Sequence, residues 1–428
     1  MLKLQMKNKL TRNTLWLSAG QGLRLMIQAA FFTIIARSLG VSNFGSFVGV
    51  VALVGILYPF GSLGSGNLLV KNVARDRQLF SAMWGAALIT TTLCGAILVI
   101  VVLLLAHFVL PAVIPLRLVF LVAVSDILGL NLITIAGQAF QAFEQMHWMA
   151  AISVSLSTSR LLGVFVLVAV FRHPSALQWG YVYLCTTAIV AIMSSGFVIA
   201  KLGMPRLGLR RSLAEIREGF YFSISLSAQT IYNDIDKTML ARLGTLDATG
   251  IYGAAYRIVD VTVAPVQAML YAAYPNFFRQ GSTGISSGFA YAKPLLKRAM
   301  GYGVLVCVGI LLLAGIVPYI LGAEYARTTE ALRWLSPLPL LKATHYFLSD
   351  TLTGAGHQGL RSGIQTGVAL FNVLINLWLI PAYSWRGAAW SSIASDALLA
   401  SAVGMAVFIL SKRSQPLVAL KPQEPLSQ

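Results

Sequence analysis

Long apolar segments recur along the whole chain, and they constrain its fold more than any other feature. Each runs for about 18 to 25 residues, the length that an α-helix needs to cross about 30 Å of hydrocarbon at 1.5 Å per residue. Of the 428 residues, 57% are apolar and 11% are charged, whereas soluble domains carry about 25% charged residues. No stretch remains for a sizeable soluble domain. The sequence therefore predicts an all-α integral membrane protein.

We place about twelve transmembrane helices on these segments. Helices are expected because each N–H and C=O in hydrocarbon needs a partner within its own segment, and because the alternation of polar and apolar residues found in barrel strands is absent. The first segment follows a basic N-terminus but is too long for a signal peptide, so we expect it to be retained. The predicted spans are residues 13–37, 44–66, 81–106, 115–139, 147–171, 179–201, 218–242, 250–278, 298–321, 333–354, 361–380 and 386–411.

Lysine and arginine in the short connections predict the orientation. With a cytoplasmic N-terminus, 20 of these residues lie on the cytoplasmic side and seven on the other. We therefore expect both ends of the chain in the cytoplasm. The net charge of +18 is spread over loops rather than gathered on one polar face, so no nucleic-acid partner is expected. The remaining five cations fall inside spans: Arg24, Arg160, Lys237, Arg257 and Lys342.

Two segments of the chain resemble each other and indicate an internal repeat. Ala36–Phe47 and Ala241–Tyr252 both contain Ala-Arg, Leu-Gly, a short polar turn, a second glycine and an aromatic residue. Glycine-containing turns are also common at helix ends, which is the alternative explanation. Six spans in each half would give the halves the same orientation, an arrangement found in transporters. The predicted divisions are an N-terminal lobe 1–202, a basic cytoplasmic linker 203–217, a C-terminal lobe 218–411 and a cytoplasmic tail 412–428.

Several packing and turn patterns occur in a characteristic order and spacing. They are Ile35–Phe47, Asp234–Leu240, Thr249–Ile258, Leu321–Tyr325, Leu335–Leu338, Asn372–Asn376, Ile380–Pro381 and Arg386–Ala389. In these patterns nearly the whole chain resembles the polysaccharide-unit flippases, which are the O-antigen and lipid-linked oligosaccharide translocases of the multidrug/oligosaccharidyl-lipid/polysaccharide exporter superfamily.

The resemblance implies a fold and a function. It implies two six-helix lobes around a central cavity, alternating access, and a substrate built on undecaprenyl pyrophosphate. It also implies a place in the bacterial inner membrane, contact with membrane lipids, and association with the polysaccharide polymerase machinery.

The cations inside the spans are the first candidates for substrate binding. An ionised side chain at the centre of a membrane helix costs about 3 kcal/mol, so it is normally paired or faces water. Arg24 lies midway along the first span, and a planar guanidinium suits the pyrophosphate of a lipid-linked substrate. The alternative is a salt bridge from Arg24 to Asp126 or to another carboxylate, which would hold helices together. The predicted substrate-binding residues are Arg24, Arg257, Lys237, Arg160 and Lys342, although Arg160 and Lys342 could instead extend to the membrane interface.

Acidic residues inside the spans are candidates for coupling transport to a proton or cation. Asp234, Asp236 and Asp260 lie in the seventh and eighth spans, where burial brings carboxyl groups towards titration near neutral pH. The alternative is local neutralisation, since a spacing of three residues places Asp234 beside Lys237 and Arg257 beside Asp260 on one helix face.

No motif indicates an enzyme, a cofactor or a metal site. The sequence contains no HExxH or P-loop motif, and no catalytic residues or cofactors are expected. A membrane polymerase or ligase of polysaccharide units is one alternative, and a multidrug or cation antiporter of the same superfamily is another. The cysteines lie within apolar runs, and the histidines are expected at helix ends without ligand spacing: His107, His147, His173, His345 and His357.

Overall fold

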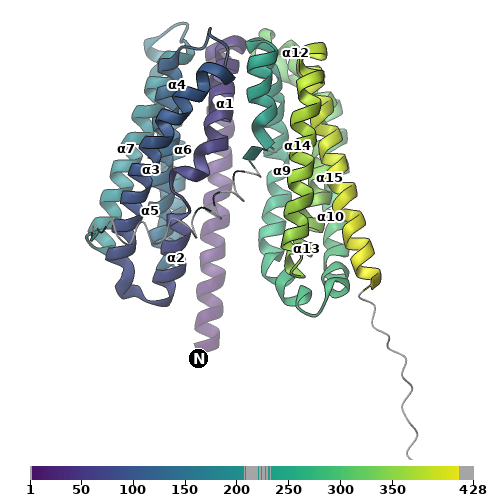
Figure 1. Ribbon diagram of the computed structural model, residues 1–428. Helices are drawn as coiled ribbons and strands as arrows, with labels where there is room; N and C mark the ends of the chain where they lie inside the picture. The colour runs from purple at the N-terminus through teal and green to yellow at the C-terminus, as the bar shows by residue number, and fades with distance from the viewer. Residues whose placement is uncertain are drawn as a thin grey trace, which may run out of the picture.

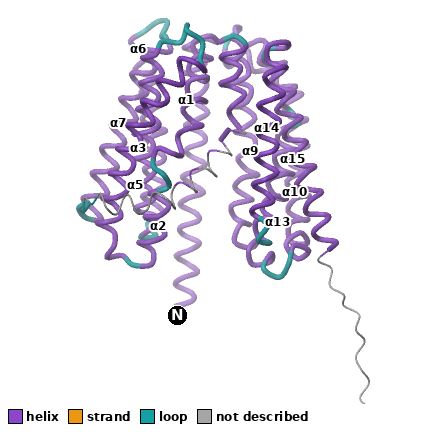
Figure 2. The backbone as a smooth tube through the Cα atoms, viewed as in Figure 1, coloured by secondary structure: helices purple, strands orange, loops and turns teal. Residues whose placement is uncertain are grey.

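A computed structural model describes residues 2–206, 208, 220, 223, 227, 230, 231 and 233–413. Side chains are described from residue 22 onwards, except those of residues 75, 271, 272, 275 and 413. The described residues are helical with short connections, and they contain no strand (Figure 2). The all-α prediction is therefore confirmed. The predicted linker 203–217 and tail 412–428 lie largely outside the described residues.

The first half of the chain forms a run of helices up to residue 202. They are α1 (Leu2–Gly61), α2 (Ser65–Arg75), α3 (Phe80–Val109), α4 (Leu116–Ala123), α5 (Asn131–Ala142), α6 (Met146–Val170) and α7 (Ala176–Leu202), with a π-helical segment, Val124–Leu130, between α4 and α5.

The second half is described from residue 233, and residues 233–243 are helical. The helices that follow are α9 (Leu246–Gly281), α10 (Ile285–Leu313), α11 (Val317–Leu321), α12 (Ala326–Leu335), α13 (Leu338–Gly354), α14 (Gln358–Tyr383) and α15 (Trp385–Arg413).

The helices gather in two groups, α1 to α7 and α9 to α15 (Figure 1). We call these the N-terminal and C-terminal lobes. Where α4 and α12 lie, one apolar core contains residues of both lobes, including Phe44 and Tyr252. At the opposite end each lobe has a core of its own, built around Trp84 in one and Leu352 in the other. The lobes are therefore packed together at one end, which we call the joined end, and separate at the other.

Helix α1 bends sharply where it reaches the joined end. Gly40 has φ 71° and ψ 170°, so α1 consists of two helical pieces that correspond to the first two predicted spans. Glycine adopts this conformation without the strain that a side chain would add. A Cβ atom at Gly40 would also lie 2.8 Å from a carboxylate oxygen of Glu324 in the C-terminal lobe. The bend places the start of the second piece against the other lobe.

Two glycines of the repeated segments allow the lobes to pack closely against each other. A Cβ atom at Gly45 would overlap the carbonyl oxygen of Leu246, and one at Gly250 would overlap the carbonyl oxygen of Val41. Small residues allow membrane helices to approach this closely. The Val41 amide also donates a hydrogen bond of 3.3 Å to the Glu324 carboxylate. The similar segments thus meet at the joined end.

Eight helical stretches of the described chain are long and apolar enough to cross a membrane. The first, Gly22–Ala74, covers two predicted spans. Predicted spans 250–278 and 333–354, which correspond to α9 and to the 17-residue α13, are not among them, and span 218–242 lies partly outside the described residues. The count of about twelve spans stays a prediction. These two helices, α9 and α13, carry Arg257, Asp260 and Lys342 of the predicted site residues.

Candidate substrate and coupling site

Three arginines from both lobes lie at similar depth in the molecule. Arg24 is on α1, Arg160 on α6 and Arg257 on α9. Helix α1 reaches the joined end at its Gly40 bend, and α6 and α9 each reach it at one of their own ends. At 1.5 Å per residue, the three arginines lie about 15 to 25 Å along their helices from that end. Arg24 is within electrostatic range of Arg160 and Arg257. Helix α1 packs against both α6 and α9, which brings the three side chains into one region. We call them the arginine cluster.

The arginine cluster is only partly neutralised. Among the described residues, Arg24 and Arg257 make no hydrogen bond and no ion pair. The alternative pairing of Arg24 with Asp126 is wrong, because the Asp126 carboxylate contacts Arg160 Nη2 at 3.4 Å. The alternative pairing of Arg257 with Asp260 is also wrong, because the Asp260 carboxylate pairs with Lys342 at 3.6 Å. Within the described part of the chain, two guanidinium charges are therefore left without a counter-ion.

The Arg160 pair is buried in the N-terminal lobe. Asp126 lies in the π-helical segment and accepts a hydrogen bond of 2.9 Å from the Tyr183 hydroxyl. The Arg160 guanidinium stacks 4.1 Å from the centroid of the Tyr183 ring, and its Nη2 lies 3.5 Å from Thr187 Oγ1. A buried charge is tolerated when it is paired and hydrogen-bonded in this way. Arg160 is thus the member of the cluster that has a counter-ion.

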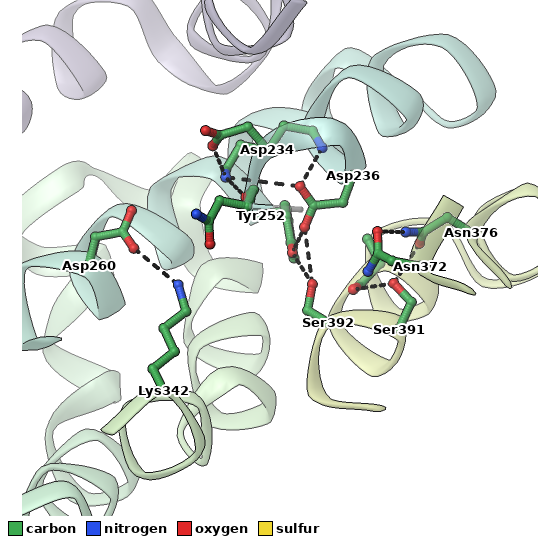
Figure 3. Close-up of polar contacts among 12 residues, drawn as sticks. Asp234, Asp236, Tyr252, Asp260, Lys342, Asn372, Asn376, Ser391 and Ser392 are labelled. Atoms are coloured by element: carbon green, nitrogen blue, oxygen red, sulfur yellow. Dashed lines mark hydrogen bonds and ion pairs between the residues drawn. The ribbon is translucent and has the colours of Figure 1, made fainter. Parts of the chain in front are cut away.

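In the C-terminal lobe, acids and a lysine form a compact network (Figure 3). Lys237 Nζ contacts Asp234 at 2.6 Å and Asp236 at 3.9 Å, so the predicted neutralisation of Asp234 by Lys237 is confirmed. Asp236 also accepts hydrogen bonds from the hydroxyls of Tyr252 and Ser392. The Asp236 side chain is 3% exposed and that of Asp234 is 37% exposed. Only Asp234 of the two acids is therefore open to its surroundings.

A second lysine, Lys342, shares a tyrosine ring with Lys237. The Nζ atoms of Lys237 and Lys342 are 4.0 Å and 4.6 Å from the centroid of the Tyr256 ring, a distance suited to cation–π attraction. Lys342 Nζ lies 3.6 Å from the Asp260 carboxylate. Asp350, which shares a predicted span with Lys342, instead pairs with Arg361. The structure thus brings Lys237, Lys342 and Asp260 into one group.

Amide and hydroxyl groups continue the network between α14 and α15. Asn376 donates to the Asn372 side chain at 3.0 Å, and the Ser391 hydroxyl donates to Asn376 at 2.6 Å. Ser391 adjoins Ser392, which bonds to Asp236. All of these side chains are buried. Asp236 therefore sits at the edge of a buried group of oxygen atoms.

Sequence reasoning missed a buried acid–histidine pair. His345 was expected at a helix end, but it is buried within α13, and its Nε2 lies 2.9 Å from Asp396 on α15. Histidine counts gave no indication of this pairing. The acids singled out inside the predicted spans did not include Asp396, which lies in the predicted span 386–411. Tyr252 and Ser392 carry no such signal, because tyrosine and serine are common in membrane helices.

A polar cavity of about 380 Å³ lies at the joined end, away from the arginine cluster. It is lined by the bend of α1, by the connection between α6 and α7, and by Glu324. Arg37 and His173 contribute to its wall. Since Arg24 precedes Arg37 by 13 residues, about 20 Å of helix separates the two positions. The cavity therefore does not include the predicted substrate-binding cations.

The fold is shared with known membrane transporters. One solved structure, the inward-facing conformation of a multidrug resistance MATE family transporter of the MOP superfamily, matches with TM-score 0.73 and 16% identity over 91% of this chain and 96% of that one. The lipid II flippase MurJ, in an inward closed conformation, matches with TM-score 0.72 and 11% identity over 92% of this chain and 87% of that one. These similarities establish the transporter fold.

Sequence comparison agrees with the resemblance to polysaccharide-unit flippases. A protein of Escherichia coli (strain K12) named "Putative O-antigen transporter" is 23% identical over 412 residues, which is 94% of this chain and 97% of the relative. The family model described as polysaccharide biosynthesis protein matches residues 10–280, more than half of the chain. The chain therefore belongs to the polysaccharide biosynthesis protein family.

Proposed function

We propose that this protein flips undecaprenyl-pyrophosphate-linked oligosaccharide repeat units from the cytoplasmic to the outer leaflet of a bacterial inner membrane, by alternating access. Family membership, the relative named as an O-antigen transporter and the fold shared with a lipid II flippase support this proposal. Both termini would be cytoplasmic, and the joined end would face outward. The proposed activity is transport and includes no covalent chemistry.

The observation that carries the proposal is the pair of arginines without counter-ions. Arg24 and Arg257 come from different lobes and, among the described residues, have no ion-pair partner. An unpaired cation at membrane depth costs about 3 kcal/mol, which an anionic ligand would offset. Guanidinium groups bind phosphate oxygens through two parallel hydrogen bonds. A diphosphate held between the lobes would meet both residues.

The same charges argue against a carrier of cationic drugs. Such a substrate would meet the positive charges of Arg24 and Arg257 in the region between the lobes. The exposed acids of this region, Asp234 and Asp260, are already engaged with Lys237 and Lys342. An anionic substrate is therefore the better match.

The acids of the C-terminal lobe form the proposed coupling site. Asp236 is buried among Tyr252, Ser392 and the Lys237 ammonium, so its charge state is sensitive to any rearrangement of the lobe. Asp234 and Asp260 would contribute through their lysine partners. The test replaces Asp234, Asp236 and Asp260 one at a time by Asn. Full transport with unchanged pH and Na⁺ dependence in all three variants would remove the coupling role.

A gene deletion in the native host tests the proposed substrate. The deletion should leave lipid-linked repeat units trapped on the cytoplasmic leaflet, and wild-type protein should release them whereas Arg24→Gln should not. Unpolymerised units delivered to the outside would instead indicate a polymerase. Unchanged polysaccharide together with greater drug sensitivity would indicate a multidrug transporter.

A further inference from the structure

Asp126 is a buried acid to which the proposed function assigns no role. Its side chain is 9% exposed and lies in the π-helical segment Val124–Leu130. Such segments are rare and frequently occur at functional sites. The carboxylate is held by the Tyr183 hydroxyl at 2.9 Å and by Arg160 Nη2 at 3.4 Å. One long contact to Arg160 therefore supplies its counter-charge.

The other groups around Asp126 are neutral. Helices α1, α3, α4, α5 and α7 pack against the π-helical segment. Among the described side chains, α1 contributes Tyr58, which is within electrostatic range of Asp126, and α7 contributes Tyr183. No interaction with Asp126 is found for the titratable residues of α3 and α4, and α5 contains none. Arg160, from α6, is thus the cation on which the Asp126 charge depends.

Arg160 faces two ways, towards Asp126 and towards the arginine cluster. It lies within electrostatic range of Arg24. Its Nη2 atom makes two long contacts, of 3.4 Å to Asp126 and 3.5 Å to Thr187, and its buried Nε has no hydrogen-bond partner among the described residues. A guanidinium has five N–H donors, so most of this capacity is unused. A phosphate group beside Arg24 would offer Arg160 shorter, charge-assisted hydrogen bonds.

We propose that Asp126 is a proton-binding site linked to the substrate: a diphosphate bound by Arg24 and Arg257 draws Arg160 away from Asp126, and Asp126 then takes a proton from water. This inference rests on the proposed function. A buried carboxylate that loses its counter-charge is neutralised rather than left ionised. When the diphosphate leaves, Arg160 returns to Asp126 and the proton is released. Binding should therefore tighten as pH falls, by up to about tenfold per pH unit for one linked proton.

The test uses the full-length protein in lipid nanodiscs, with farnesyl diphosphate as the probe. Work at about pH 8 keeps the diphosphate itself ionised, since its last pKa is near 6. Infrared difference spectra should show the carbonyl band of a newly protonated carboxyl group when the probe binds wild-type protein. Asp126→Asn should bind the probe and lose this band. Arg160→Gln should show the band before the probe is added and no further change.

A matched control comes from the C-terminal lobe. Asp350 is also a buried acid paired with an arginine, Arg361, but it lies outside the arginine cluster. Asp350→Asn should keep the probe-dependent band. Probe binding to wild-type protein without the band, or a band that persists in Asp126→Asn, overturns the proton site while leaving the proposed function intact. Failure of the probe to bind wild-type protein overturns both.

Discussion

The intramembrane cations differ in whether an acid balances them. Arg160, Lys237 and Lys342 each have a carboxylate within 4 Å and each also lies over a tyrosine ring. Arg24 and Arg257 have no such partner among the described residues. The paired cations therefore contribute first to the stability of their lobes, and the proposed function assigns the other two to an anionic ligand.

Lys237 should stabilise the C-terminal lobe far more than the exposed acid beside it. Lys237→Ala leaves the buried Asp236 without a cation, and losing one member of a buried pair costs about 3 to 5 kcal/mol. Asp234→Asn keeps the contact between Lys237 and Asp236 and removes a group that is 37% exposed, so it should cost less than about 1 kcal/mol. Thermal unfolding of the purified variants measures the difference. Equal shifts would contradict the assignment.

Sequence spacing identified the charged residues but not always their partners. The three-residue step from Asp234 to Lys237 correctly predicted an ion pair. The same step from Arg257 to Asp260 did not, because Asp260 pairs instead with Lys342 on α13. Contacts within one helix follow from its period, whereas contacts between helices depend on packing that no local pattern encodes.

Among the elements, α12 and α15 are linked at the joined end by an exposed ion pair. Arg386 donates two hydrogen bonds to the Glu330 carboxylate, at 2.9 Å and 3.0 Å. These bonds lower the pKa of Glu330 below its usual value. A lowered pKa in the folded state means that the pair stabilises the protein above the unfolded-state pKa and that this contribution is lost as pH falls through the folded-state value.

Glu330→Gln should therefore be less stable than wild type near neutral pH and equally stable in acid. The difference should be small because both side chains are about half exposed. The unfolding temperature measured from about pH 3 to pH 7 for both proteins tests this, since the usual glutamate pKa is about 4.3. A difference that grows towards acid pH would contradict the predicted sign.

Apolar length predicted where most helices lie, but not their irregularities. The first two predicted spans correspond to the pieces of α1 on either side of Gly40. The π-helical segment around Asp126, which packs against α7, follows no hydropathy pattern. Hydropathy therefore located the elements, and the polar details of the site needed the tertiary arrangement.

At the scale of the whole molecule, the proposed alternating access requires the contact between the lobes at the joined end to break during transport. A Cβ atom at Gly253 would lie 3.5 Å from Val48 Cβ across the interface, a distance suited to a disulfide. With Cys94, Cys185 and Cys307 replaced by Ala, Val48→Cys combined with Gly253→Cys should form a disulfide on oxidation. Transport should stop and return on reduction.

A disulfide within one lobe provides the control for this experiment. A Cβ atom at Gly180 would lie 3.6 Å from Leu121 Cβ, and both residues belong to the N-terminal lobe. The pair Leu121→Cys and Gly180→Cys should leave transport active when oxidised, because lobes that move as units keep this distance. Full transport by the oxidised Val48/Gly253 variant would show that the joined end need not open.

Flipping in reconstituted vesicles tests the role of Arg24 and Arg257 most directly. Purified wild-type protein, Arg24→Gln, Arg257→Gln and Arg386→Gln would be compared for transfer of an undecaprenyl-pyrophosphate-linked oligosaccharide between leaflets. Each of the first two substitutions should slow transfer about 10- to 100-fold, the loss expected for one charge-assisted hydrogen-bonding group, and Arg386→Gln should match wild type. Wild-type rates in both Arg24→Gln and Arg257→Gln would contradict the proposal that these arginines hold the diphosphate.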